Sequence, residues 1–130
     1  MVGTMAQEKN LDNKVIDFLK CKKCWCIKYW SGARYTKAGV PDILACIDGH
    51  FFGIENKAKT GRPSLLQLKN LEWIRHAGGF GILLYSDDFK NFKRFVDELR
   101  EDELVTEWQF EWYSKNIDLQ KEWEEKLKTS

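Results

Sequence analysis

The sequence contains no long hydrophobic run and no leader of the kind that directs secretion. No stretch approaches the roughly 18 consecutive apolar residues that a membrane span requires, and residues 1–9 lack the apolar core of a signal peptide. We therefore expect a soluble, cytoplasmic protein without a membrane partner. The four cysteines are then expected to be reduced.

The chain also lacks internal repeats, low-complexity segments and linkers. Its 130 residues, of which 43% are hydrophobic and 32% charged, are enough to close one hydrophobic core. This composition excludes a disordered tail and a two-domain enzyme, and it predicts one globular domain.

There is no excess of basic residues, because 21 Lys and Arg stand against 20 Asp and Glu. Such a balance argues against a nucleic-acid partner only if the charges are evenly spread. However, residues 20–41 contain six basic residues and no acid, whereas residues 86–130 contain eight basic and thirteen acidic residues. We therefore expect the basic side to face DNA, and the acidic end to face away from it or toward a partner subunit.

Hydrophobic periodicity and turn signals predict seven elements in the order αβββαβα. Helices are predicted over 6–20, 64–77 and 88–99, and strands over 25–30, 43–47, 50–54 and 80–85. In the tail, Leu119, Trp123 and Leu127 indicate an amphipathic helix, whereas residues 108–112 fit a strand as well as a helix. We expect an α/β fold with a mixed β-sheet flanked by helices.

The clearest local signal is Asp48-Gly49 between two β-rich runs, which predicts a two-residue hairpin with a type I′ turn. In the register that this turn imposes, Asp42 lies opposite Glu55. The pair falls at a position without backbone hydrogen bonds, where Cβ atoms are about 4.5–5.5 Å apart. Lys57 projects from the same face of the hairpin, because side-chain direction has a period of two.

Two carboxylates placed in this way repel each other, so either one is protonated or a cation lies between them. Oxygen ligands with room for water suit Mg²⁺ or Mn²⁺. Lys57 can hold a water molecule or stabilise negative charge on a phosphoryl group. Taken singly, Asp42 could be a turn residue and Glu55 and Lys57 a solvated strand face. Together they favour a catalytic metal site.

Two short motifs, Gly-Val-Pro-Asp at 39–42 and Ile-Glu-Asn-Lys at 54–57, resemble the Pro-Asp…Glu-x-Lys active site of the restriction-endonuclease-like nucleases. Within that superfamily the chain resembles the VRR-NUC family, which includes compact phage-encoded members and the nuclease domain of the Fanconi-associated nuclease. The similarity covers roughly residues 6–100 and includes Glu8, Ser31-Gly-Ala-Arg34, Gln67-Leu68 and Ala77-Gly-Gly79.

The resemblance implies a restriction-endonuclease-like core and a nuclease domain over residues 1–100, in a protein of bacterial or phage type. Residues 101–130 would form an acidic extension that packs on the same domain or on a partner subunit. The implied activity is Mg²⁺-dependent hydrolysis of DNA phosphodiester bonds, with Mn²⁺ as a substitute. The implied catalytic residues are Asp42, Glu55, Lys57, Glu8 and Gln67. The implied metal ligands are Glu8, Asp42, Glu55 and the backbone carbonyl of Asn56, whose side chain points to the other face.

Two of these residues have a second interpretation. Acids near a helix N-terminus are favoured by the helix dipole, so Glu8 is also open to a structural role. Ser64-Leu-Leu-Gln67 is a capping-box pattern, in which the glutamine bonds back to the Ser64 amide. Gln67 nevertheless shares a helix face with Leu71, which points it toward the sheet. Both of its roles stay open.

The cysteines invite a zinc or iron–sulfur interpretation, because Cys21, Cys24 and Cys26 are close in sequence while Cys46 is distant. Their C-x2-C-x-C spacing lacks the second paired half that a structural zinc site normally has. The spacing therefore favours ordinary buried thiols.

Basic residues interleaved with aromatic ones make residues 20–37 the best candidate for contact with the DNA backbone. The predicted DNA-binding residues are Lys28, Ser31, Arg34, Lys37, Lys59 and Arg62. The compact relatives imply a homodimer that cuts branched DNA such as a Holliday junction, and the tryptophans at 108, 112 and 123 would suit an interface. The alternative is a non-catalytic DNA-binding or recombination-accessory protein with an idle site.

Overall fold

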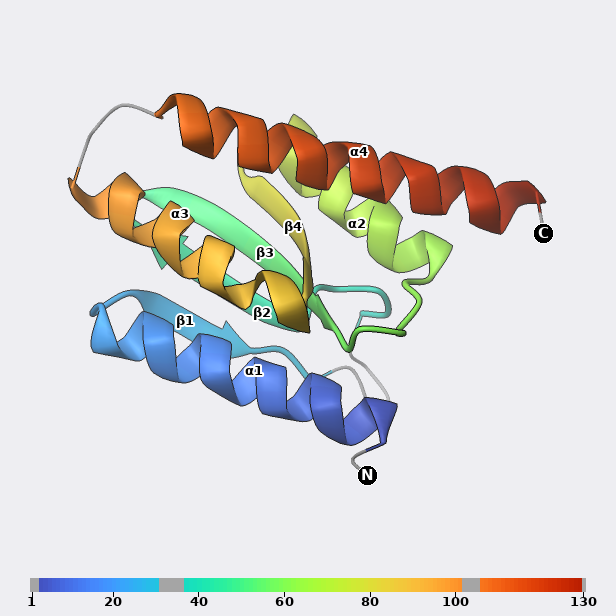
Figure 1. The fold of residues 1–130 in the computed structure, drawn as a ribbon, viewed down its shortest axis with the longest axis horizontal. Helices are drawn as coiled ribbons and strands as arrows, with labels where there is room; N and C mark the ends of the chain where they lie inside the picture. The colour runs from blue at the N-terminus through green and yellow to red at the C-terminus, as the bar shows by residue number, and fades with distance from the viewer. Residues whose placement is uncertain (1–2, 31–36, 102–105, 130) are drawn as a thin grey trace.

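The computed structural model describes residues 3–30, 37–101 and 106–129, and shows in them a four-stranded mixed sheet flanked by helices (Figure 1). The strands lie in the order β1-β2-β3-β4, with antiparallel pairing among the first three and parallel pairing between β3 and β4. The elements along the chain are α1 (Thr4–Cys21), β1 (Trp25–Lys28), β2 (Ile43–Ile47), β3 (His50–Lys57), α2 (Leu65–His76), β4 (Phe80–Tyr85), the short 3-10 helix η1 (Ser86–Asp88), α3 (Phe89–Glu101) and α4 (Glu107–Thr129). The predicted class and the order of seven elements are confirmed, and residues 108–112 belong to α4.

The hairpin between β2 and β3 has the predicted turn. Asp48 and Gly49 both have positive φ, at 50° and 84°, as a type I′ turn requires. The predicted register holds from Ile47, which faces His50, to the pair of Ile43 and Ile54. The ladder ends there, so the backbone pairing predicted for residues 42 and 55 is wrong.

Instead, Asp42 makes separate bonds to both neighbouring strands. Its carbonyl oxygen accepts a hydrogen bond from the Tyr29 backbone N–H at 2.7 Å. Its carboxylate Oδ2 accepts one from the Asn56 backbone N–H at 2.9 Å. Asp42 is therefore held between β1 and β3 even though it lies just outside β2.

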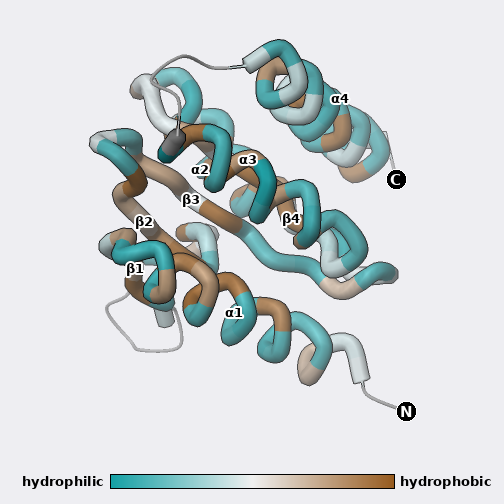
Figure 2. Tube along the Cα trace, turned by 60° about the vertical axis from the view of Figure 1, so that its left-hand side comes forward, coloured by the Kyte–Doolittle hydropathy of each residue, from teal (hydrophilic) through white to brown (hydrophobic). Residues whose placement is uncertain are grey.

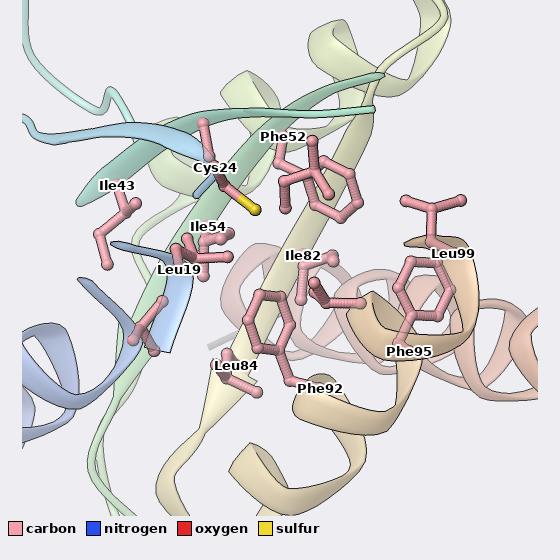
Figure 3. Close-up of a cluster of buried hydrophobic side chains, with 14 of the residues drawn as sticks. Leu19, Cys24, Ile43, Phe52, Ile54, Ile82, Leu84, Phe92, Phe95 and Leu99 are labelled. Carbon is pink, nitrogen blue, oxygen red and sulfur yellow. The ribbon is translucent and has the colours of Figure 1, made fainter. Parts of the chain in front are cut away.

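One face of the sheet carries the main hydrophobic core, which α1 and α3 cover. Figure 3 shows this cluster, in which Leu19 from α1 and Phe92 and Phe95 from α3 surround side chains of the strands. These residues are buried because the apolar stripes of both helices point to the sheet. Burial of each such side chain is worth about 1.5–3 kcal/mol. The buried strand residues here are Ile43, Ala45, Ile47, Phe52, Ile54, Ile82 and Leu84.

The other face is covered over β3 and β4 by α2, which approaches the strands closely at two glycines. Gly53 and Gly81 are register partners on these parallel strands. A Cβ atom at Gly53 would lie 2.4 Å from Ile74 Cδ1, and one at Gly81 would lie 2.4 Å from the Leu71 carbonyl oxygen. Larger residues at these two positions would push α2 away from the sheet.

The helix α4 begins with a capping box that the sequence analysis overlooked. The Thr106 hydroxyl oxygen accepts a hydrogen bond from the Gln109 N–H at 3.1 Å, and Gln109 Oε1 accepts one from the Thr106 N–H at 2.7 Å. The Thr-x-x-Gln pattern at 106–109 was the signal that could have decided between strand and helix.

From this cap, α4 runs along the free edge of β4 and beside α2 (Figure 1). Asn116 Oδ1 accepts a hydrogen bond from the Leu83 N–H at 3.0 Å, and Asn116 Nδ2 donates one to the Leu83 carbonyl at 2.7 Å. One turn on, Gln120 Nε2 donates to the Gly81 carbonyl at 2.9 Å. The side-chain amides of Asn116 and Gln120 therefore bond to backbone groups at the edge of β4 that a fifth strand would otherwise pair with.

Of the three tail tryptophans, Trp112 is buried, while Trp108 and Trp123 are partly buried. Trp112 is buried and donates a hydrogen bond to Asp88 Oδ2 at 3.0 Å. Trp108 stacks on Trp112, with ring centroids 6.2 Å apart, and Arg94 lies over its ring. None of the described helices is long and apolar enough to cross a membrane.

Candidate active site

The last three residues of β3 carry the polar groups of the candidate site. Figure 2 shows that β3 changes from hydrophobic to hydrophilic along its length. Glu55 and Lys57 lie on the face that α2 covers, and Lys57 Nζ is 3.6 Å from Glu55 Oε2. Both side chains are buried, and Asp42 stands beside them at the start of β2.

Glu55 is a deeply buried carboxyl whose hydrogen bonding is incomplete in the described part of the chain. It is 1% exposed, and its Oε1 is buried without a hydrogen-bond partner there. Burial raises its pKa to about 9, and repulsion from Asp42 adds to this, while Lys57 acts in the opposite direction. The charge of Lys57 therefore does not offset the cost of ionising Glu55. The Glu55 carboxyl is more stable when it holds a proton or binds a cation of higher charge.

Ionisation of Asp42 is also disfavoured by burial, but a hydrogen bond stabilises its charged form. Burial raises its pKa, and the hydrogen bond from the Asn56 N–H opposes that rise, while repulsion from Asp12 adds to it. Its side chain is only partly buried and lines a cavity of about 330 Å³, which has room for several water molecules. Asp42 is therefore the member of the pair that solvent and ions can reach.

Two acids of α1 line the same cavity. Glu8 Oε1 lies 3.5 Å from the Ala58 backbone N–H, just past the end of β3. Asp12, one helical turn later, is 7% exposed and lies 3.4 Å from Lys28 Nζ. The sequence analysis missed Asp12, although its spacing of four residues from Glu8 places both on one helix face.

Asn56 connects Asp12 to Asp42. Its side chain points to the opposite face from Glu55, as the sequence predicts, and its Nδ2 donates a hydrogen bond to Asp12 Oδ1 at 2.7 Å. Its backbone N–H holds the Asp42 carboxylate. An apolar residue at position 56 could not make the first of these bonds.

The structure places Gln67 in the helix cap. Its Oε1 accepts a hydrogen bond from the Ser64 N–H at 2.9 Å, and the Ser64 hydroxyl accepts one from the Gln67 N–H at 3.1 Å. These bonds occupy the carbonyl oxygen of the side chain. Of the two roles that the sequence left open, the geometry shows capping, and no hydrogen bond joins Gln67 to Asp42, Glu55 or Lys57 in the described residues.

The predicted DNA-binding residues fall in two places. Lys28 is beside the acidic cavity, and Lys37 lies over the Trp73 ring at 5.7 Å. Lys59 and Arg62 are exposed on the loop after β3. Ser31 and Arg34 lie outside the described residues.

The four cysteines do not share one environment. All of them are free thiols. Cys24 is buried, Cys26 is partly buried, and Cys21 and Cys46 are exposed. The expectation of buried thiols is therefore right for Cys24 and wrong for Cys21 and Cys46.

The donor set fits a magnesium ion held by two carboxylates. Protein sites for Mg²⁺ commonly offer one or two carboxylates and leave the remaining positions to water and substrate phosphate. Asp42 and Glu55 supply that pair, and the unpartnered Glu55 oxygen is an unused ligand. Across residues 3–30, 37–101 and 106–129, no three acidic, histidine or cysteine side chains are grouped closely enough to hold a metal ion alone.

Comparison with protein-family models, with curated proteins and with solved structures finds no match to this chain.

Proposed function

We propose that this protein is a metal-dependent nuclease that hydrolyses DNA phosphodiester bonds, with a restriction-endonuclease-like core of the VRR-NUC type. The observation that carries the proposal is the pairing of the partly buried Asp42 with the buried Glu55 beside Lys57, with one Glu55 oxygen left without a hydrogen-bond partner in the described residues. A purely structural pair would be expected to have its buried oxygens satisfied. Raised pKa values in two neighbouring carboxyls, of which Asp42 lines a cavity, are typical of functional sites.

In the proposed site, Asp42, Glu55 and the Asn56 carbonyl would hold Mg²⁺, with Mn²⁺ as a substitute, and Glu8 would join directly or through water. The ion would supply Lewis-acid polarisation of the scissile phosphoryl group. Lys57 would orient the attacking water and stabilise negative charge on the phosphoryl oxygens. Asn56 keeps Asp42 in position through its backbone N–H. The reaction consumes one water, breaks one phosphorus–oxygen bond, and yields a phosphate monoester and a free hydroxyl group.

We further propose branched DNA as the preferred substrate and a homodimer as the active form. Beside the tail tryptophans, a second group of apolar side chains supports a dimer. On the part of the α2-covered face that α2 leaves free, toward β1, Trp25 is 59% and Phe51 is 44% exposed, and both lie in register with the exposed Cys46. Such a group of exposed apolar side chains is typical of an interface. Sedimentation as a monomer at micromolar concentration would contradict the dimer.

Cleavage assays with two substrates test the nuclease proposal. Plasmid and a four-way junction are incubated with the protein and Mg²⁺ or Mn²⁺, with EDTA as the metal-free control. Asp42→Ala and Lys57→Ala should each lower the cleavage rate about a hundredfold or more, because each removes a group that acts on the developing charge. Lys90→Ala, which removes an exposed lysine of α3, should change little.

Two results would contradict the proposal. One is cleavage that survives both substitutions, since it would come from a contaminant or another site. The other is a wild-type protein that cuts neither substrate. If such a protein still bound the junction, the recombination-accessory alternative would be favoured.

A further inference from the structure

A second cavity lies on the other side of the loop that follows β3. It measures about 410 Å³, within the range of cavities that hold small ligands. The loop supplies Lys59 and Arg62, the end of β4 supplies Tyr85, and α4 supplies Trp123 and Lys126. The acidic tail therefore contributes an aromatic ring and a cation to a basic cavity, which the sequence-based expectation that it faces away from DNA did not foresee.

The charges around this cavity are not neutralised by the protein. Lys59, Arg62 and Lys126 form no ion pair with any carboxylate in the described residues. Glu122 is the one acid that lines the cavity, so the lining carries a net charge of +2 from three cations and one carboxylate. An anionic ligand would be attracted here, and unpaired lysine and arginine side chains are typical of phosphate binding.

An aromatic ring lies among these cations. The Arg62 guanidinium carbon is 5.9 Å and the Lys126 Nζ is 5.0 Å from the centre of the Trp123 ring. Trp123 is partly buried, because it packs against the second hydrophobic cluster with Leu68, Leu71 and Leu83. A tryptophan fixed in this way beside cations is the combination that single-stranded nucleic-acid sites use, with bases stacked on the ring and phosphates near the cations.

The cavity shares a wall with the candidate active site. Tyr85 and Lys57 are register partners on parallel strands, which lie about 4.8 Å apart. The Tyr85 hydroxyl donates a hydrogen bond to the Gly61 carbonyl at 2.8 Å. From the other side Glu8 approaches the same glycine so closely that a Cβ atom there would lie 2.7 Å from Glu8 Oε1. A DNA strand bound at Asp42 and Glu55 could therefore extend past Lys57 and Tyr85 into the cavity that Trp123 lines.

We propose that this cavity binds an unpaired nucleotide of the DNA substrate next to the cleaved bond, with the base against Trp123 and the phosphate near Lys59, Arg62 and Lys126. The proposal rests on the proposed nuclease function and deepens it. A base inside a duplex is stacked and cannot reach the ring, so the cavity selects DNA that has unpaired nucleotides at a branch or flap.

Binding measurements without metal separate this site from catalysis. Fluorescence anisotropy in EDTA compares a flapped duplex with a linear duplex of the same length. Trp123→Ala should weaken binding of the flapped DNA about tenfold and of the linear duplex less than about twofold. Trp123→Phe keeps an aromatic ring and should restore most of the loss, which a mere folding defect would not allow.

A charge-matched pair of variants tests the phosphate contact. Lys126→Ala should weaken flapped-DNA binding and lower the slope of log affinity against log salt by about one. Lys128→Ala removes the same charge from α4, but Lys128 pairs with Glu124 at 2.9 Å outside the cavity, so it should leave that slope nearly unchanged. Both lysines are exposed, so neither substitution should unfold the protein.

The outcomes distinguish this inference from the nuclease proposal. If the wild type cleaves DNA but Trp123→Ala and Lys126→Ala bind flapped and linear DNA as the wild type does, the cavity is not a nucleotide site and the nuclease proposal stands. If the wild type binds flapped DNA with the expected dependence on Trp123 but never cleaves it, the nuclease proposal fails and the site stands. Wild-type binding that does not distinguish flapped from linear DNA would overturn the inference.

Discussion

Two groups of buried polar side chains lie against the same sheet, and only one of them is satisfied. On α4, Asn116 and Gln120 are 4% and 2% exposed, and their amides bond to the backbone of β4, to each other and to Arg75. At the end of β3, Glu55 is as deeply buried, yet one of its oxygens has no hydrogen-bond partner in the described residues.

The difference separates an architectural role from a ligand-binding role. A buried amide that finds all its partners lowers the free energy of the fold and needs nothing else. A buried carboxyl without partners destabilises the fold unless a proton or a cation binds to it. The first group therefore accounts for the packing of α4, and the second is the group on which the proposed metal site rests.

The largest effect on stability is expected at the satisfied group. Asn116→Leu leaves both the N–H and the carbonyl of Leu83 without partners in a buried place, so it should lower the free energy of unfolding by about 2–4 kcal/mol. Urea unfolding measures this, with the exposed Asn10→Ala as control. A loss below about 0.5 kcal/mol would show that α4 does not depend on this amide.

The second effect concerns Glu55 and has the opposite sign. In EDTA, Glu55→Gln should raise the free energy of unfolding by about 1–3 kcal/mol at pH 8, because the amide is neutral without taking up a proton, whereas Glu55 must hold a proton at a pH where the unfolded chain has lost it. This gain should grow with pH. Burial raises the pKa of Glu55 from 4.5 to about 9 in the folded state. The wild type is therefore most stable, relative to Glu55→Gln, below about pH 4.5, and it loses stability as the pH rises toward 9.

Urea unfolding at pH 5, 7 and 9 checks this dependence. The exposed Glu111→Gln serves as the control, because it should show no such growth with pH. A stability difference between Glu55→Gln and the wild type that stays constant over this range would mean that Glu55 is ionised throughout.

The smallest effect is stabilisation by the metal ion. Mg²⁺ at ten times its dissociation constant should stabilise the wild type by about 1.4 kcal/mol, which corresponds to a rise of about 5 °C in Tm. Glu55→Gln should lose most of this rise, whereas Asn116→Leu should keep it despite its lower starting Tm. A wild-type Tm that does not change with either Mg²⁺ or Mn²⁺ would contradict the proposed metal site.

The predictability of the two groups from sequence differs for a physical reason. The proximity of the Asp42 and Glu55 carboxyls follows from a two-residue turn, since Asp48 and Gly49 fix the register of β2 and β3 up to the pair of Ile43 and Ile54. The backbone ladder stops one pair before position 42, because Asp42 turns its carboxylate to the Asn56 N–H, and no pairing rule anticipates that.

The α4 group could not be predicted in the same way. Asn116 and Gln120 are polar residues in an acidic segment, so the sequence indicates a solvated face, yet both are buried against β4. The capping pattern at 106–109 marks where the helix starts but not what it packs on. Gln67 shows the same limit, because only the structure decides that its side-chain oxygen caps α2.

The sequence by itself determined the first seven elements, the hairpin register up to Ile43 and Ile54, and the proximity of Asp42, Glu55 and Lys57, because these depend on residues close together in the chain. The tertiary structure decided that Asp12 joins the acids and that Trp123 faces the loop after β3. These contacts join residues more than forty positions apart. They depend on how α1 and α4 pack against the sheet, and that packing depends on side chains from the whole chain at once.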